Sequence, residues 1–150
     1  MAGARRTYDY VIVGAGSAGC VLANRLSEAA DVLVLEAGGP DDREEIHVPL
    51  LYPTLFKSEL DWDYATAPQP GLNGRRAYWP RGKTLGGSSS INSMVYVRGN
   101  PWDFDRWERL GNDGWSYDDL LPCFRRMEDF EGGASEYHGA DGPLQIARPD

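Results

Sequence analysis

The 150-residue chain is poor in the residues that build metal sites and disulfide frameworks. It contains two histidines and two cysteines, and Cys20 and Cys123 lie far apart without a C-x-x-C spacing. Structural zinc sites use cysteine and histidine at short spacings, so we predict no metal site. A structural disulfide is not expected in a protein without a secretion signal. We expect Cys20 to be a small packed side chain.

Long apolar runs are also missing. The stretch Met1–Arg6 is short and polar, and the apolar run after it extends only from Val11 to Val13 before glycines begin. A membrane-spanning helix needs about 20 apolar residues, and a signal peptide needs an apolar core of about 7–15 residues. We therefore expect neither a transmembrane segment nor a signal peptide, and we expect a cytoplasmic protein.

Basic charge is scarce. The chain has 15 Lys and Arg against 23 Asp and Glu, which gives a formal net charge of −8. Nucleic-acid-binding domains usually carry an excess of basic residues, so we expect no nucleic-acid partner. A hydrophobic fraction of 41% is typical of a globular protein, and a chain of this length can form a domain with a core.

Glycine, in contrast, occurs in a distinctive pattern at residues 14–19, Gly-Ala-Gly-Ser-Ala-Gly. The preceding residues 8–13 are typical of a buried parallel strand, and residues 18–26 have the apolar spacing of a helix. Residues 32–35 predict a second strand, which ends at the acidic Glu36. Strand, glycine turn, helix, strand and acid together predict a dinucleotide-binding unit.

Each of these glycines has a physical role in such a unit. Gly14 permits a sharp turn, Gly16 lets a pyrophosphate approach the backbone, and Gly19 lets the helix pack closely on the strand. Glu36 follows Gly14 at about the 20-residue offset expected for a carboxylate that hydrogen-bonds a ribose hydroxyl. Its charge would repel a 2′-phosphate and so disfavours NADP. A tight turn that binds no ligand remains the alternative.

The rest of the chain predicts short elements. Residues 39–76 are rich in turn-forming residues. We expect a short helix beginning near residues 46–52, a strand at 62–66, helices at 103–110 and 116–129, and a strand at 142–147. The second long helix should be capped by Ser116, with Asp119 three residues later. Only two central parallel strands can be placed, so we expect a fragment of a larger protein.

A second glycine-rich segment spans residues 81–92 and contains Gly86-Gly87 and three consecutive serines. Such a segment exposes backbone N–H groups and hydroxyls that could surround a phosphate or a polar ring edge. Residues 82–84, Gly-Lys-Thr, resemble the end of a Walker A loop. Residues 77–80, Ala-Tyr-Trp-Pro, lack the glycines that this loop requires, so we reject that interpretation.

The chain resembles the glucose–methanol–choline (GMC) family of FAD-dependent oxidoreductases, especially its alcohol and choline dehydrogenase branch. The resemblance rests on residues 14–19 with 36–39, on residues 82–105, and on residues 138–144. It implies an α/β fold: the N-terminal part of a Rossmann-like FAD-binding domain over residues 1–150, with the substrate domain largely absent. The FAD fingerprint would occupy residues 8–39, the family signature 82–105, and the start of the substrate domain 138–150.

The resemblance implies FAD as the cofactor. Residues 14–19 would hold the pyrophosphate, Glu36 the ribose, and residues 92–95 would lie near the isoalloxazine ring, with Ser93 closest to its reactive position. The implied cofactor-binding residues are Gly14, Ala15, Gly16, Ser17, Ala18, Gly19, Glu36, Ala37, Trp62, Gly82, Lys83, Thr84, Leu85, Gly86, Gly87, Asn92, Ser93, Met94 and Val95. Trp62 could instead be a core residue.

Some family members attach FAD covalently through a histidine, and the matching residue here is Ile91. Isoleucine has no nucleophilic atom, so the resemblance implies non-covalent FAD. We expect His138 to be structural.

The implied reaction is oxidation of the CH–OH group of a choline-like or other primary alcohol, with hydride transfer to flavin N5. The family's catalytic histidine and its partner, a second histidine or an asparagine, would lie beyond Asp150, so we assign no catalytic residue and expect residues 1–150 alone to be inactive. The electron acceptor is left open. An NAD-dependent dehydrogenase and a non-catalytic nucleotide-binding fragment of a truncated chain are the alternatives.

Overall fold

The computed structural model describes residues 6–148, which divide into two compact units. The first unit ends at Val95 and the second begins at Tyr96. Most of the polar stretch that argued against a signal peptide, residues 1–5, lies outside the described residues. Residues 149–150, the end of the predicted start of the substrate domain, lie outside them as well. No helix in residues 6–148 has the length and apolar character needed to cross a membrane.

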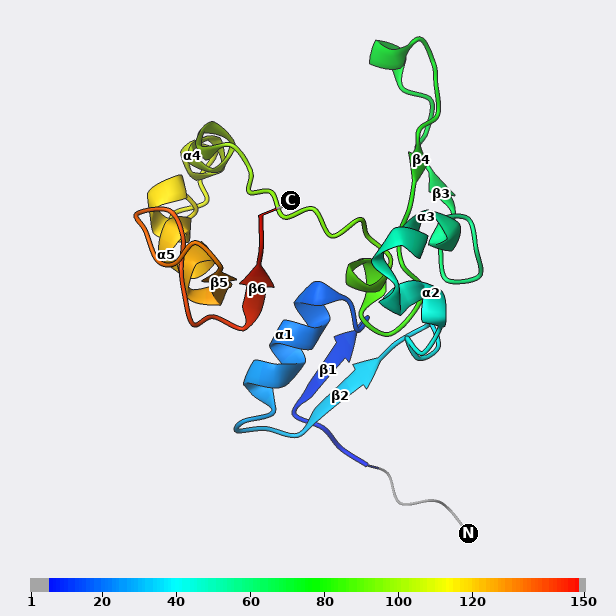
Figure 1. The fold of residues 1–150 in the computed structure, drawn as a ribbon, viewed down its shortest axis with the longest axis horizontal. Helices are drawn as coiled ribbons and strands as arrows, with labels where there is room; N and C mark the ends of the chain where they lie inside the picture. Colours follow the sequence, from blue (N-terminus) through cyan, green and yellow to red (C-terminus); the bar gives the residue numbers. More distant parts are fainter. Residues whose placement is uncertain (1–5, 149–150) are drawn as a thin grey trace. The chain divides into compact units, whose positions relative to one another are not determined.

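The first unit begins with the predicted strand–helix–strand unit (Figure 1). Strand β1 (Tyr10–Val13) leads into helix α1 (Ser17–Leu26), and strand β2 (Val32–Leu35) follows. The two strands pair in parallel, with Tyr10 opposite Val32 and Val13 opposite Leu35. Strand β1 starts two residues later than predicted, and the side chain of Asp9 accepts a hydrogen bond from the amide of Asp31 (2.9 Å) instead.

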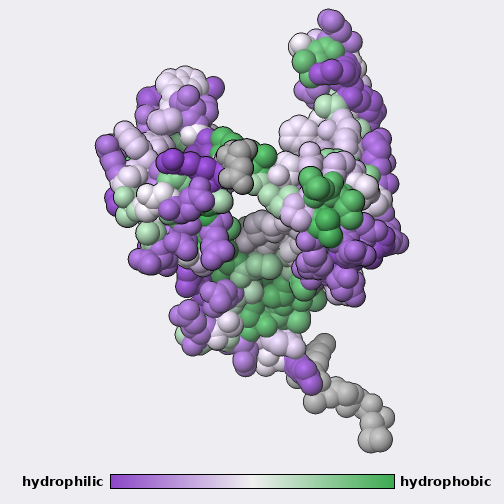
Figure 2. Space-filling model, in the orientation of Figure 1, coloured by the Kyte–Doolittle hydropathy of each residue, from purple (hydrophilic) through white to green (hydrophobic). Residues whose placement is uncertain are grey.

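The two faces of this small sheet differ. On one face Ile12 is buried, and a Cβ built on Gly19 of α1 would lie 3.3 Å from the Ile12 side chain. On the other face Val11 is exposed and Val13 is 85% exposed. Figure 2 shows apolar surface over this part of the molecule. Among the described residues, α1 covers one face of the sheet only, so the predicted burial of residues 8–13 holds on that face and not on the other.

A small core forms where the chain was predicted to be turn-rich. Helix α2 (Glu44–His47), a 3₁₀ helix (Pro49–Leu51) and helix α3 (Tyr52–Leu55) replace the single short helix expected there. Leu55, Leu60 and Ile91 are buried together, and Ile46 and Tyr52 pack against them. The helix is broken because the residue before a proline is biased away from helical geometry, as Val48 is before Pro49.

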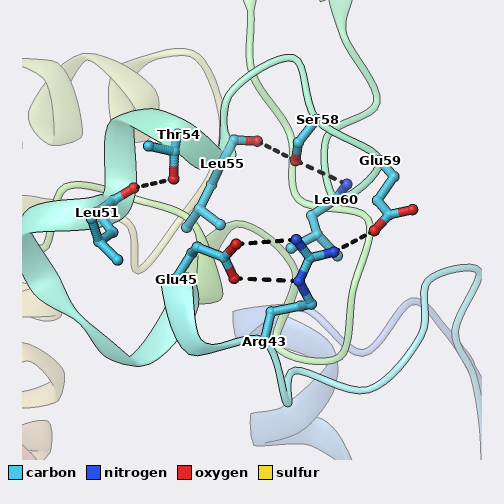
Figure 3. Close-up of polar contacts among 8 residues, drawn as sticks. All are labelled: Arg43, Glu45, Leu51, Thr54, Leu55, Ser58, Glu59 and Leu60. Atoms are coloured by element: carbon cyan, nitrogen blue, oxygen red, sulfur yellow. Dashed lines mark hydrogen bonds and ion pairs between the residues drawn. The ribbon is translucent and has the colours of Figure 1, made fainter.

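Polar contacts hold the loop that follows α3 (Figure 3). Arg43 forms ion pairs with Glu45 and Glu59. The hydroxyl of Ser58 donates to the carbonyl of Leu55 (2.7 Å) and accepts from the amide of Leu60 (3.1 Å). The loop leads into strand β3 (Tyr64–Ala65), which pairs antiparallel with β4 (Tyr78–Trp79) across a 3₁₀ helix at Pro70–Leu72. The strand predicted at 62–66 is thus present but shorter.

The second unit contains the two predicted helices. Helix α4 (Pro101–Arg109) starts two residues earlier than expected, because the Asn100 side chain caps it by accepting from the amide of Trp102 and Pro101 occupies the first turn. Helix α5 (Tyr117–Met127) is capped by Ser116, which accepts from the amide of Asp119 (3.2 Å), as predicted. Phe104 is buried between the helices and packs on Phe124 at 5.6 Å between ring centroids.

Helix α5 ends two residues before the predicted boundary. Residues Glu128–Phe130 form strand β5, which pairs in parallel with β6 (Leu144–Ile146). The predicted strand at 142–147 is therefore present. The helical pattern continues through Asp129 in the sequence, but pairing with β6 draws these residues into an extended conformation.

Candidate cofactor site

The two glycine-rich segments lie side by side in the first unit. The amide of Gly86 donates to the carbonyl of Ala15, and the amide of Leu85 donates to the carbonyl of Gly39, each at 2.8 Å. Gly16 forms a parallel bridge with Gly86. The two segments, which the sequence suggested separately as phosphate-binding loops, thus form one surface.

Glycine is required at the closest approaches. Gly87 has a left-handed backbone (φ 58°), and a Cβ on it would lie 2.9 Å from the Cα of Gly16. A Cβ on Gly38 would lie 2.2 Å from the carbonyl carbon of Lys83. A Cβ on Gly16 would instead meet no atom within 4 Å, so the turn after β1 faces open space.

Glu36 ties the turn after β1 to the end of β2. One carboxylate oxygen accepts from the amide of Ala15 (2.7 Å), and the other accepts from the amide of Gly38 (2.8 Å). These bonds, the one from Gly38 first and the one from Ala15 next, lower the pKa of Glu36. The sequence did not indicate this backbone role. The predicted bond from Glu36 to a ribose hydroxyl remains a prediction.

A cavity of about 610 Å³ opens where these elements meet. A volume of this order is typical of small-molecule and cofactor sites. Seven predicted cofactor-binding residues line it: Gly14, Gly16, Glu36, Ala37, Trp62, Gly82 and Gly87. Six more lining residues were not among the predicted cofactor-binding residues, although Arg81 and Ser88 belong to the second glycine-rich segment: Val13, Leu35, Tyr64, Trp79, Arg81 and Ser88.

One wall of the cavity is aromatic and positively charged. The rings of Trp62 and Tyr64 stack with centroids 5.8 Å apart and planes 9° from parallel. The ammonium of Lys83 lies 4.9 Å from the ring centroid of Trp62. The guanidinium of Arg81 lies 5.1 Å from the ring centroid of Trp79. Trp62 is 39% exposed, so the alternative that it is a core residue is wrong. Alternating faces in residues 62–66 could have indicated that Trp62 and Tyr64 share a side.

Other predicted residues support the cavity rather than line it. Ala15 is buried, and Gly19 packs on the turn, since a Cβ there would lie 2.0 Å from the carbonyl oxygen of Gly14. Thr84 is fully buried, and its hydroxyl is 3.1 Å from the carbonyl oxygens of both Gly39 and Pro40. The other predicted residues that do not line the cavity are Ser17, Ala18, Lys83, Leu85 and Gly86. Direct contact of any of them with a cofactor stays a prediction.

The segment predicted to lie near the isoalloxazine ring is separate from that cavity. Asn92 and Met94 line a second cavity of about 220 Å³, next to His47 and Tyr52. Met94 has a left-handed backbone (φ 58°), and its amide donates to the side-chain oxygen of Asn92 (2.7 Å). Ser93 and Val95 are exposed. Their role at the flavin stays a prediction.

Three further residues can be placed. Ile91 is 2% exposed in the small core. The Nδ1 of His138 lies 3.2 Å from the Glu128 carboxylate, and its ring stacks on Phe130 at 4.1 Å; its structural role stays a prediction. Cys20 is exposed, so the expectation that it would be packed is wrong. Its thiol lies on the first turn of α1, 3.2 Å from the carbonyl oxygen of Ala15.

With this geometry in view, sequence comparison places the chain in a family. The model of the GMC oxidoreductase family matches residues 8–149, and the chain belongs to that family. The resemblance and the FAD-binding fold class predicted from the sequence are confirmed.

The curated relatives that the chain matches include choline dehydrogenases. It is 57% identical over 141 residues to the oxygen-dependent choline dehydrogenase of Vibrio vulnificus (strain YJ016), covering 91% of this chain and 25% of that protein. It is 52% identical over 154 residues to the mitochondrial choline dehydrogenase of Homo sapiens, covering 96% of this chain and 26% of that protein. The chain therefore spans about a quarter of the length of these relatives.

Solved structures of other oxidases have a similar fold over most of this chain. A pyridoxine 4-oxidase from Mesorbium loti superposes with a TM-score of 0.87 at 44% identity, covering 96% of this chain and 29% of that one. A formate oxidase superposes with a TM-score of 0.79 at 37% identity, covering 93% of this chain and 26% of that one.

Proposed function

We propose that the full-length protein is an FAD-dependent oxidoreductase that oxidises the CH–OH group of choline or a similar primary alcohol. The observation that carries the proposal is the pairing of the glycine turn after β1 with residues 84–87 around one cavity. Family membership and the identity to choline dehydrogenases support the flavin and the substrate class. An NAD-dependent dehydrogenase would leave the second glycine segment without a role.

The residues of the cavity fit the adenosine and pyrophosphate parts of FAD. Gly14 and Gly16 leave open space in front of their backbone, where a phosphate could approach. Glu36 would accept from a ribose hydroxyl with lone pairs left by its two backbone bonds. The lining side chains of Trp62 and Tyr64 offer flat apolar faces to a purine ring.

FAD would be bound without a covalent link. Isoleucine has no nucleophilic atom, and Ile91 packs against Leu55 and Leu60 in the core. The chemistry that FAD supplies when bound is acceptance of hydride from the alcohol carbon at flavin N5. This chain's own residues bind and orient the cofactor, and none of them is proposed as the catalytic base.

The experiment is anaerobic mixing of the purified full-length protein with choline. Choline should bleach the flavin absorbance band, since hydride transfer reduces the flavin. Ethyltrimethylammonium is the matched control, because it carries the same cation without the hydroxyl, and it should leave the band unchanged. A flavin band that neither choline nor other primary alcohols bleach would overturn the proposed activity.

A further inference from the structure

Asp61 is a buried acidic side chain of the first unit with four hydrogen-bond partners. It is 6% exposed. One carboxylate oxygen accepts from the amides of Asp63 (3.1 Å) and Arg81 (2.9 Å). The other oxygen accepts from the amide of Lys57 (2.9 Å) and from the hydroxyl of Tyr78. All four partners are donors, so a carboxylate satisfies them and no neutral side chain of the same shape does.

The loop that Asp61 holds has an unfavourable backbone at both ends. Lys57 and Asp63 have left-handed conformations, with φ of 59° and 49°. Residues with side chains avoid this region unless their surroundings enforce it, and such positions are frequent at ligand sites. The carboxylate of Asp61 accepts from the amides of both residues. It therefore fixes the two strained positions that shape the loop.

The same carboxylate connects two residues that line the cavity, Trp62 and Arg81. Trp62 lies between Asp61 and Asp63 in the chain, and its amide donates to the carbonyl of Arg81 (2.9 Å). Trp62 and Arg81 both line the cavity that also contains Glu36. Because Asp61 holds the backbone on each side of that pair, it fixes Trp62 and Arg81 relative to each other.

The hydrogen bonds to Asp61 favour its charged form. Burial is the largest single effect and opposes ionisation, but the hydrogen bonds from Tyr78, Lys57, Arg81 and Asp63 outweigh it and lower the pKa of Asp61 to about 2. Burial and the Asp61 contact raise the pKa of Tyr78 to about 12, so the phenol keeps the proton that it donates.

We propose that Asp61 is a positioning residue of the cofactor site, which sets Trp62 and Arg81 against the adenosine half of FAD. The inference rests on the proposed function, since it takes FAD as the ligand of the cavity. Asp61 itself does not line the cavity and acts through its neighbours.

The test uses the full-length protein, stripped of flavin, with ADP as a probe of the adenosine and pyrophosphate half. Titrations with ADP and with FAD compare the wild type with Asp61→Asn at a temperature where circular dichroism shows both folded. An amide must turn its NH₂ group toward two of the four donors, so we expect the affinity for ADP and for FAD to fall by a similar factor, about tenfold.

Asp42→Asn is the matched control. It removes the same charge from an exposed position of the first unit that does not line the 610 Å³ cavity. Its affinities should stay within about twofold of the wild type. Tyr78→Phe removes one of the four donors and should give an intermediate loss, and it carries the test if Asp61→Asn does not fold.

The outcomes separate the two proposals. A wild-type protein that binds no FAD overturns the proposed function. A wild type that binds FAD, with folded variants that bind ADP as tightly as the wild type does, overturns the role of Asp61 and leaves the proposed function standing. A lower unfolding temperature with unchanged ADP affinity would likewise assign Asp61 a purely structural role.

Discussion

The backbone of Gly87 lies against that of Gly16, so close that a Cβ on Gly87 would be 2.9 Å from the Cα of Gly16. Gly16 belongs to the turn after β1, and Gly87 belongs to a segment much later in the chain. Both residues line the 610 Å³ cavity. The shape of the cavity at Gly16 and Gly87 therefore depends on the absence of a side chain at both residues.

Gly87→Ala should distort the cavity where Gly87 meets Gly16. A left-handed alanine costs about 1–2 kcal/mol, and the new Cβ must push the turn at Gly16 away. We expect the free energy of unfolding of the full-length protein to fall by at least that amount and FAD affinity to fall with it. Chemical denaturation and flavin titration measure the two effects. Gly71→Ala is the control, because a Cβ there meets no atom within 4 Å; equal behaviour of the two variants would refute the steric argument.

Glu36→Gln should weaken FAD binding. The carboxylate accepts from the amides of Ala15 and Gly38, and a glutamine must turn its NH₂ group toward one of these donors. Losing one charge-assisted hydrogen bond costs about 1.5–3 kcal/mol, so we expect the dissociation constant to rise about tenfold or more. Glu44→Gln, at an exposed position of α2, is the control. Unchanged affinity in the titration would show that Glu36 does not bind the ribose of FAD.

The second unit should lose stability in acid through Glu128. This carboxylate is fully buried, accepts from the amide of Gly139 (3.0 Å), and pairs with Arg98 and His138. Burial, the largest effect, opposes ionisation, but the hydrogen bond from Gly139 and the pairing with Arg98 oppose it and help to lower the pKa of Glu128 from 4.5 to about 2. Because the folded pKa lies below the unfolded one, the stabilisation is complete above about pH 4.5 and is lost as the pH falls through 2.

The corresponding measurement is the free energy of unfolding as a function of pH. Glu128→Gln should be destabilised by about 3 kcal/mol at pH 7, and this difference should shrink steadily between pH 4.5 and pH 2. Glu136→Gln, at an exposed position of the same unit, should show no such trend. A difference that stays constant over that interval would mean that Glu128 does not stabilise the fold through its charge.

The flavin should be released by acid. With Ile91 in the core at the position where some family members carry a histidine, acid precipitation of the full-length protein should leave the flavin in the supernatant. Flavin that remains with the precipitate after washing would show a covalent link elsewhere and contradict the prediction.

The local elements were predictable because their signals are local. The strand–turn–helix–strand unit follows from apolar runs separated by Gly14, Gly16 and Gly19, and the start of α5 follows from Ser116. The end of α5 was not predictable, because Glu128 is extended only through pairing with β6. Which residues of β1 are exposed, such as Val13, could not be predicted for a similar reason: burial of a strand depends on what packs over it.

The candidate site was predictable in part. Gly14, Gly16 and Glu36 are fixed by spacing within a single motif, and Gly82 and Gly87 belong to the second glycine-rich segment. Tyr64, Trp79 and Arg81 were missed, because they reach the cavity through the β3–β4 hairpin, whose register is set by long-range pairing. Asp61 was missed because its partners at Lys57, Tyr78 and Arg81 converge only in three dimensions.

The most direct test of the account is native mass spectrometry of the purified full-length protein, followed by identification of the small molecule that it releases. The account predicts one FAD per chain, with the free mass of unmodified FAD in the released fraction. A protein that carries a nicotinamide dinucleotide in place of a flavin, or that binds no FAD when FAD is supplied, would contradict it.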